Sequence, residues 1–250
     1  MDRIVKMSFK LIALALGIAG VVVGKEIEPT PKNYEKELKS GVSGWSVSLF
    51  GGANLNRPDD AKVSGFGLGS SNLSTKGSDL GGVAGIKLGY DFTPFNEGSV
   101  LEVAPALEFE GFYTGFQHKG SVDRLSGVGL EADLDLGVIS LNPLLKFKYQ
   151  SIQFYGGFGL GGAYISTDGA KGTGLASGLV QPQASNDTVF ALQGIAGVDL
   201  WVAQNWSLFT EYKYLNLFDG KLGKSSATQM KASFDSFGMH IVNAGIRYHF

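Results

Sequence analysis

Polar and apolar residues alternate along most of the chain with a period of two, which is typical of half-buried β-strands. Stretches rich in Gly, Ser, Asn and Asp separate eight such segments. The segments span Trp45–Leu55, Leu80–Phe92, Val100–Tyr113, Ala132–Tyr149, Ile152–Ser166, Thr188–Val202, Trp206–Phe218 and Phe237–Phe250. The pattern predicts an all-β fold of eight antiparallel strands.

The intervals between these segments alternate between long and short. Long intervals cover residues 56–79, 114–131, 167–187 and 219–236, and short ones cover 93–99, 150–151 and 203–205. Barrels of the outer membrane have short periplasmic turns and long outer loops. The order therefore predicts an eight-stranded antiparallel up-and-down transmembrane β-barrel over residues 43–250, with four long extracellular loops.

The two faces of each predicted strand differ in chemistry. In the last segment Val242, Ile246 and Phe250 share one face, and Asn243 and Arg247 share the other. Parity alone also fits a soluble barrel with an apolar interior. Eight strands enclose too narrow a space for the bulky Trp, Tyr, Phe and Leu side chains of the apolar face, so we expect that face to contact lipid.

Aromatic residues gather near both ends of the predicted strands, as in the interfacial girdles of membrane barrels. Those expected at the periplasmic end are Tyr90, Phe92, Tyr149, Trp206, Tyr248 and Phe250. Those expected at the outer end are Tyr113, Tyr164, Phe190, Tyr214 and Phe237.

Charged residues on the polar face are expected to point into the lumen. They are Lys87, Asp91, Glu102, Glu108, Asp199, Glu211, Lys213 and Arg247. Because an unpaired buried charge is costly, we expect a structural ion-pair network. Lys146 and Lys148 share this face and are expected to pair near Glu102 on the neighbouring strand. A narrow, gated ion path through the same charges is the alternative interpretation.

Two prolines fall inside predicted strands, although a closed barrel has no edge strand. In the fourth segment the apolar residues also change from even to odd positions: Leu134, Leu136 and Val138 are followed by Leu145, Phe147 and Tyr149. A β-bulge between Ile139 and Pro143 would absorb both Pro143 and the change of phase. Pro105 has no comparable explanation in the sequence.

The N-terminus has the features of a secretory signal peptide. Basic residues at positions 3, 6 and 10 precede 14 apolar or Gly residues, Leu11–Gly24. Because a spanning helix needs about 20 residues, a retained membrane helix is the weaker alternative. We predict a signal peptide over residues 1–24, cleaved after Gly24 or alternatively after Gly20, and a polar periplasmic lead over residues 25–42.

Composition narrows the function classes. Charged residues make up 18% and the formal net charge is -2, which argues against a basic nucleic-acid-binding face. The sequence has no Cys, so disulfides, thiolate metal sites and a Cys nucleophile are excluded. Gly accounts for 37 of the 250 residues, which indicates crowded or sharply curved β-structure.

Three segments resemble the opacity-protein and OmpA-type eight-stranded barrels of bacterial outer membranes. They are Ala244–Phe250, with its terminal Phe, Trp206–Tyr214 as a penultimate strand, and the Gly-rich Tyr155–Tyr164 as a fifth strand. The resemblance covers roughly residues 42–250. It implies an integral outer-membrane location in contact with lipid, including lipopolysaccharide. It also implies periplasmic chaperones and a barrel-assembly machinery that reads Ile246, Tyr248 and Phe250.

No catalytic, cofactor or metal site is predicted. The only histidines are His118, His240 and His249, and none has the spacing of a metal site or of a nucleophile–base pair. The Gly-rich stretches at 65–69 and 169–178 lack the Gly-Lys-Ser/Thr of a phosphate-binding loop. We expect a non-enzymatic protein with a structural or surface-contact and adhesion role, with a host or surface ligand at its loops. A narrow pore is the alternative, and a lipid-modifying enzyme with His240 as base comes third.

Fold and location can be tested together by gel migration and membrane fractionation. We expect an unheated sample to run as a compact, detergent-resistant band that shifts on boiling, and to be found in the outer-membrane fraction. A single band whose migration does not respond to heat would contradict the barrel.

Overall fold

The computed structural model describes residues 43–56, 61–64, 70–75, 79–122, 128–167, 171–174, 185–224 and 231–250. The predicted signal peptide and polar lead lie outside these residues and stay predictions. Among the described residues no helix is long and apolar enough to cross a membrane.

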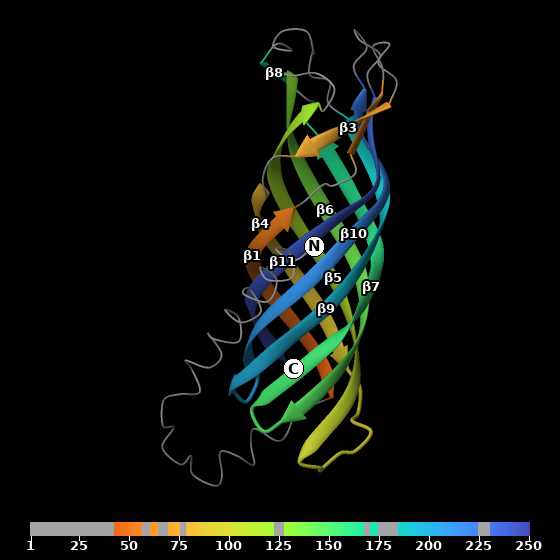
Figure 1. Cartoon of the computed structure of the whole chain (residues 1–250). Helices are drawn as coiled ribbons and strands as arrows, with labels where there is room; N and C mark the ends of the chain where they lie inside the picture. The colour runs from red at the N-terminus through yellow and green to blue at the C-terminus, as the bar shows by residue number, and fades with distance from the viewer. Residues whose placement is uncertain are drawn as a thin grey trace.

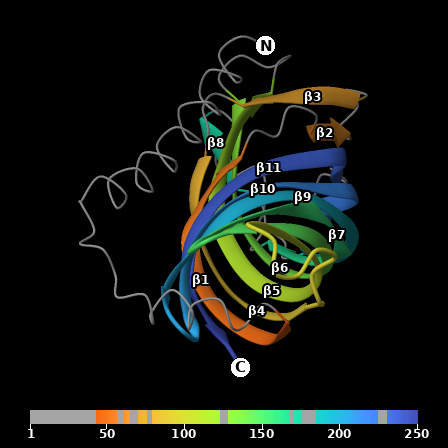
Figure 2. The same ribbon diagram turned by 90° about the horizontal axis from the view of Figure 1, so that it is seen from below.

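Eight long strands form a closed barrel (Figure 1). They are β1 (Gly44–Asn56), β4 (Asp79–Asp91), β5 (Leu101–Val122), β6 (Val128–Tyr149), β7 (Ile152–Thr167), β9 (Ser185–Ala203), β10 (Trp206–Lys224) and β11 (Lys231–His249). Each pairs antiparallel with the next long strand along the chain, and β1 pairs with β11 to close the ring. Seen from below, the strands circle a common axis (Figure 2). The predicted eight-stranded fold is confirmed.

The strands match the sequence pattern more closely at one end of the barrel than at the other. At the periplasmic end every boundary lies within one residue of the predicted one. At the outer end several strands run on, and β5 continues to Val122 rather than stopping at Tyr113. The reason is that alternation of polar and apolar residues marks only the lipid-covered part of the wall, whereas backbone pairing alone carries the wall further.

Three short strands, which lie within predicted long loops, add to the outer wall. They are β2 (Ala61–Ser64), β3 (Ser70–Thr75) and β8 (Lys171–Gly174). Strand β2 pairs with β11 and with β3, while β3 pairs with β5. The β2–β3 hairpin therefore continues the wall above β1 and β4, and β8 extends it beside β6.

The predicted bulge between Ile139 and Pro143 is wrong. The register of β5 on β6 is unbroken from Leu101 opposite Tyr149 to Ser121 opposite Gly129, and the offset of β6 on β7 is the same on both sides of Pro143. Even-numbered residues of β6 point into the lumen from Leu134 to Lys148, including the apolar Leu134, Leu136 and Val138. The inward side chains of β6 change from apolar to polar between Val138 and Ser140, while the alternation of inward and outward positions continues unchanged.

Both prolines fit the wall at little cost in hydrogen bonds. The Pro105 carbonyl accepts a hydrogen bond from Phe92 N at 3.0 Å. Pro105 is therefore opposite Phe92, which lies just past the end of β4, and the N–H that Pro105 lacks would donate outside that strand. At Pro143 the pairing of β6 with β7 is interrupted between Leu141 and Leu144 and then resumes in the same register. Each proline thus removes one local donor from one ladder.

Glycines on the inward face of the Gly-rich strand β7 provide a test of how closely the wall packs. A Cβ on Gly161 would collide with the backbone carbonyl of Ile139, whereas a Cβ on Gly194 of β9 would meet nothing within 4 Å. We expect Gly161→Ala to lower the free energy of unfolding by about 1–3 kcal/mol because of overpacking, and Gly194→Ala to change it by less than about 0.5 kcal/mol. Urea unfolding of the refolded protein measures both, and equal effects would contradict the close approach.

Candidate functional site in the barrel lumen

The outward face of the barrel is a belt of exposed apolar side chains. It includes Trp45, Leu49, Ile86, Leu88, Phe109, Ile139, Phe154, Leu208 and Ile246. The same strands bury ionised side chains on their inward faces. The expected orientation, with the apolar face outward, is confirmed. In water such a belt would be an unusually large exposed apolar surface, which argues against a soluble barrel.

Aromatic rings lie at both ends of this belt. At the periplasmic end edge-to-face pairs join Trp45 to Tyr90 at 5.1 Å, Tyr90 to Phe92 at 5.0 Å, Trp206 to Tyr248 at 4.9 Å and Tyr248 to Phe250 at 5.1 Å. Tyr149 is exposed near the same end, and Tyr113, Tyr164, Phe190 and Tyr214 are exposed near the other. Phe237 is the exception. It is only 7% exposed and packs in the lumen, so its assignment to the outer girdle is wrong.

Ten buried charges occupy the inward faces of the described strands. The five cations are Lys87, Lys146, Lys148, Lys213 and Arg247, and the five carboxylates are Asp91, Glu108, Glu110, Asp199 and Glu211. The two signs are equal in number. A cluster of this kind can be buried without a net charge, and the attraction between its members offsets the cost of removing each ion from water.

Lys87 and Glu211 lie at the centre of the network. The Lys87 ammonium is 2.7 Å from Glu211 Oε2 and 2.9 Å from Glu108 Oε1, and all three side chains are buried. Lys213 pairs with Glu110 and is 3.2 Å from Glu211 Oε1. Because Lys87 lies on β4 and Glu211 on β10, their contact links these two strands across the lumen.

Arg247 joins the network from the last strand. Its Nη1 lies 2.7 Å from Asp199 Oδ2 and its Nη2 lies 3.1 Å from Glu108 Oε2. Its Nε donates a hydrogen bond to Ser48 Oγ at 3.0 Å. Three strands are thereby tied to β11 by one guanidinium, whose forked donors suit several acceptors at once.

Aromatic rings cover the cations from within the lumen. The Lys213 ammonium lies 4.6 Å from the ring centroid of Phe50 and 4.9 Å from that of Phe112. The Arg247 guanidinium carbon lies 5.0 Å from the ring of Phe209 and 5.6 Å from that of Tyr155. These distances permit cation–π attraction, which is strongest where water is excluded. The rings were not among the predicted site residues, yet their positions share the inward parity of their strands.

Side-chain amides satisfy the far side of Glu110. Gln193 Nε2 lies 3.1 Å from Glu110 Oε2, 2.8 Å from Ser140 Oγ and 2.8 Å from Asn142 Oδ1. The Tyr155 hydroxyl donates to Glu211 Oε2 at 3.0 Å in the same way. Carboxylates that are shared by cations also receive neutral donors, so few of their lone pairs are left without a partner.

At the periplasmic end Lys148 stands opposite Glu102 on the neighbouring strand, as expected, whereas the partner of Lys146 differs from the expected one. Lys146 lies 2.6 Å from Asp91 Oδ1, and the Lys148 ammonium lies 4.6 Å from the ring centroid of Trp201. Glu102 is half-exposed, and its Oε1 accepts a hydrogen bond from Gly98 N at 3.1 Å in the adjoining turn. The structure therefore buries the other predicted lumen charges together with Lys146 and Lys148, which the sequence places on the same face, adds Glu110 to them, and places Glu102 at the rim.

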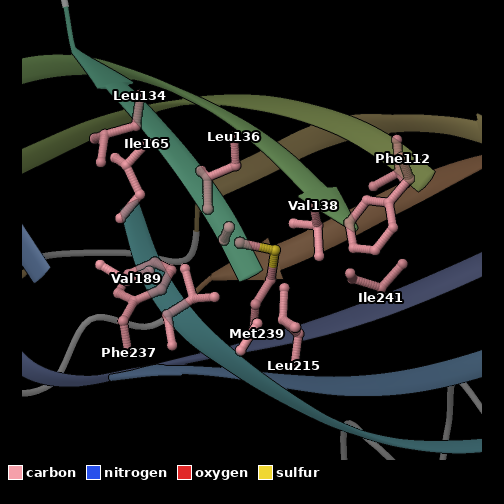
Figure 3. Packing of buried hydrophobic residues seen from close by; sticks show 14 of the residues in the cluster. Phe112, Leu134, Leu136, Val138, Ile165, Val189, Leu215, Phe237, Met239 and Ile241 are labelled. Atoms are coloured by element: carbon pink, nitrogen blue, oxygen red, sulfur yellow. The ribbon is translucent and has the colours of Figure 1, made fainter. Parts of the chain in front are cut away.

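The outer half of the lumen is apolar. Figure 3 shows side chains from several strands meeting around Met239, Leu215, Ile241 and Val138. The whole cluster comprises Phe50, Val83, Phe112, Leu134, Leu136, Val138, Ala163, Ile165, Val189, Ala191, Phe209, Leu215, Leu217, Phe237, Met239 and Ile241. Phe50, Phe112 and Phe209 belong to this cluster and also contact the cations, so they form the boundary between the two halves.

One serine and one histidine approach each other in the lumen. Ser207 Oγ lies 3.2 Å from His249 Nε2 and 3.3 Å from Asp199 Oδ1. The carboxylate that would orient a catalytic histidine instead contacts the serine and Arg247, while the His249 ring stacks on Trp201 at 4.1 Å. Ser207 is fully buried, so an acyl substrate has no route to its hydroxyl.

The other histidines do not form a site either. His240 lies on the outward face, with its Nδ1 2.7 Å from the Tyr212 hydroxyl. The side chain of His118 lies outside the described residues. Within the described parts of the chain, no group of three His, Cys, Asp or Glu residues could hold a metal ion.

Arg247 offers a test of the network. We expect Arg247→Met to lower the free energy of unfolding by about 3–5 kcal/mol, because Asp199 and Glu108 lose their common partner in a buried setting. Adding Asp199→Asn should recover part of this loss. Urea unfolding of both variants measures the coupling, and Glu97→Gln in an exposed turn is the control, with an expected change below about 0.5 kcal/mol. Strict additivity of the two lumen changes would contradict the ion pair.

Several solved structures of outer-membrane proteins are similar to this chain. The outer membrane protein OprG from Pseudomonas aeruginosa aligns at 17% identity with a TM-score of 0.56, covering 84% of this chain and 99% of that one. Neisserial surface protein A aligns at 21% identity and a TM-score of 0.44, covering 83% and 98%. Ail of Yersinia pestis, in complex with the heparin analogue sucrose octasulfate, aligns at 16% identity and a TM-score of 0.36, covering 82% and 99%. No curated protein sequence matches significantly.

The likeness to OprG extends to the fold alone at this identity. A match to a sequence family goes further. Residues 47–250 match the family described as outer membrane protein beta-barrel domain. The chain belongs to this family and is an integral β-barrel protein of the outer membrane.

Proposed function

We propose that this protein is a non-enzymatic barrel with a sealed lumen, which supports the outer membrane and makes surface contacts or adheres through its four long outer segments. The observation that carries the proposal is the filling of the lumen in two layers. Paired charges occupy the periplasmic half, and an apolar cluster occupies the outer half.

The two layers oppose ion flow for different reasons. A permeating ion would have to separate pairs such as Lys87–Glu211, whose members are buried and already neutralised. It would then lose its hydration among side chains such as Leu136, Met239 and Ile241, each of which is almost completely buried. Transfer of an unpaired charge into such a setting is strongly unfavourable. These observations favour a sealed lumen over the narrow pore.

The length of the outer wall supports a role at the surface. Strands β5 and β6 have 22 residues each, roughly twice the 9–11 that a tilted strand needs to cross a bilayer. Their outer ends rise above the rest of the barrel (Figure 1). A wall of this length would carry the outer segments clear of the membrane and present them to other surfaces, which is the usual location of binding residues in scaffolded loops.

Contacts during assembly and in the membrane form part of the proposal. The belt of exposed apolar residues would contact lipid, including lipopolysaccharide in the outer leaflet. Ile246, Tyr248 and Phe250 would serve as the signal for the barrel-assembly machinery after delivery by periplasmic chaperones. Ile246 and Phe250 are exposed on the outward face, and Phe250 N donates to Trp45 O at 3.0 Å where the barrel closes.

A planar-bilayer recording tests the sealed lumen. We expect refolded protein, checked for a heat-modifiable band, to give no reproducible discrete openings. Openings that change in amplitude with Glu211→Gln would establish a path through the charges. Openings of unchanged amplitude in that variant would establish a path beside them, and either result would contradict the sealed lumen.

The enzyme alternative is tested by the chemistry of the lipid. If the protein modifies lipid, the mass spectrum of lipid A from cells that express it will differ from that of cells that lack it. We expect identical spectra, because the only described Ser–His pair in the lumen, Ser207 with His249, is buried.

A further inference from the structure

The turn between β4 and β5 differs in chemistry from the other periplasmic turns. Phe95 is 76% exposed and Val100 is 78% exposed. The turns between β6 and β7 and between β9 and β10 carry Gln150–Ser151 and Gln204–Asn205 instead. In Figure 1 the β4–β5 hairpin, drawn in yellow, reaches farthest at the periplasmic end. An exposed apolar turn would be unfavourable in water unless something covers it.

Hydrogen bonds hold this turn in one geometry. Asn96 Nδ2 donates to Leu101 O at 2.7 Å, and Asn96 Oδ1 accepts from Val103 N at 2.8 Å. Gly98 has a φ of 81°, which favours glycine, and its N–H donates to Glu102 Oε1 at 3.1 Å. The exposed residues are therefore presented by a built turn, so little ordering entropy opposes their binding.

The apolar surface of the turn is continuous with the lipid-facing belt. Phe95 N donates to Val103 O at 2.9 Å, and Val103 shares the outward parity of Leu101 and Leu107. Phe92, at the start of the turn, contacts the Tyr90 ring of the periplasmic girdle at 5.0 Å. Phe95 lies past the end of β4 and is exposed, so it adds apolar surface next to this girdle.

The depth of Phe95 suits the headgroup layer. Three residues beyond Phe92, at about 3.3 Å each and a tilt of about 45°, correspond to roughly 7 Å along the membrane normal. The polar layer on each side of the hydrocarbon is about 5–8 Å thick. A side chain at this depth would lie among the lipid headgroups rather than in the periplasm.

We propose that residues 92–100 form an interfacial wedge that binds phospholipid of the inner leaflet and sets the depth of the barrel. The segment from Phe92 to Ala104 contains two carboxylates, Glu97 and Glu102, and no Lys or Arg. Attraction to anionic headgroups is therefore absent, and apolar contact alone holds the wedge. Because Glu97 and Glu102 repel anionic headgroups, insertion should weaken as the fraction of anionic lipid rises, and salt should screen this effect.

The absence of Cys allows single-site labelling of the full chain. Phe95→Cys and Val100→Cys would each carry an environment-sensitive fluorophore, with Gln204→Cys in a polar turn as the matched control. The proteins are refolded into vesicles of phosphatidylethanolamine and phosphatidylglycerol that contain a lipid with a nitroxide on its headgroup. We expect quenching at positions 95 and 100 to exceed that at 204 by at least threefold.

Quenching at all three positions within a factor of about 1.5 would overturn the wedge, and would leave the apolar turn as a surface for a periplasmic protein. A second pair of variants isolates the side chain. With the label at position 100, Phe95→Asn should reduce quenching to the level of position 204, whereas Glu97→Gln, which removes a repulsive charge, should not reduce it. Unchanged quenching in Phe95→Asn would also contradict the proposal. Neither result depends on whether the lumen conducts.

Discussion

The narrow bore of an eight-stranded barrel is the constraint on which this structure depends. The space admits side chains but no bulk solvent, so each inward residue must find its partners among the other inward residues. Lys87 contacts three carboxylates, and Lys213 and Arg247 contact two each. Glu108, Glu110 and Glu211 are each shared by two cations. This sharing lets a balanced set of charges be buried, and it couples strands that are distant in sequence.

The same constraint acts on the backbone. On β7 the inward positions 157, 159 and 161 are all Gly, and a Cβ at each would collide with Pro143 O, Asn142 Oδ1 or Ile139 O. The space released on this strand is used by side chains of its neighbours, such as Gln193, whose amide lies against Glu110. The high Gly content of the chain thus has a packing role. It lets one strand approach closely so that others can fill the lumen with large polar groups.

Strand number, orientation and the periplasmic boundaries could be predicted from the sequence because lipid imposes alternation on the outward face. The outer boundaries could not, since pairing continues where lipid no longer selects side chains. Leu134, Leu136 and Phe237 were misassigned because an apolar residue packed in the lumen has the same hydropathy as one in lipid. Unbroken parity through the polar Ser140 and Asn142 would have identified Leu134 and Leu136 as inward, and the parity of Arg247 would have done so for Phe237.

The charge network shows a different limit. The residues that belong to the network could be predicted from the alternation along each strand, which places Lys87, Glu211 and Arg247 inside. Glu110 lies two residues after Glu108 and so shares its face. Partner choice did not follow, because Lys87 and Glu211 are 124 residues apart and meet across the lumen. Glu102 has inward parity but lies where the wall ends, and there a turn amide competes for its carboxylate. Parity predicts the face of a residue, whereas height along the barrel decides its partners.

The order of the two layers along the axis explains why function at the outer surface is compatible with this lumen. The apolar cluster lies between the ion pairs and the outer mouth, so a change in the outer segments alters neither the hydration nor the neutrality of the charges below. Conversely, the closed pairing of eight strands fixes the cross-section of the barrel from which the long β5–β6 hairpin rises, and the ion pairs fill it. A rigid, self-contained interior therefore leaves the outer segments free to differ in sequence without loss of fold, which is the condition under which binding sites evolve on a scaffold.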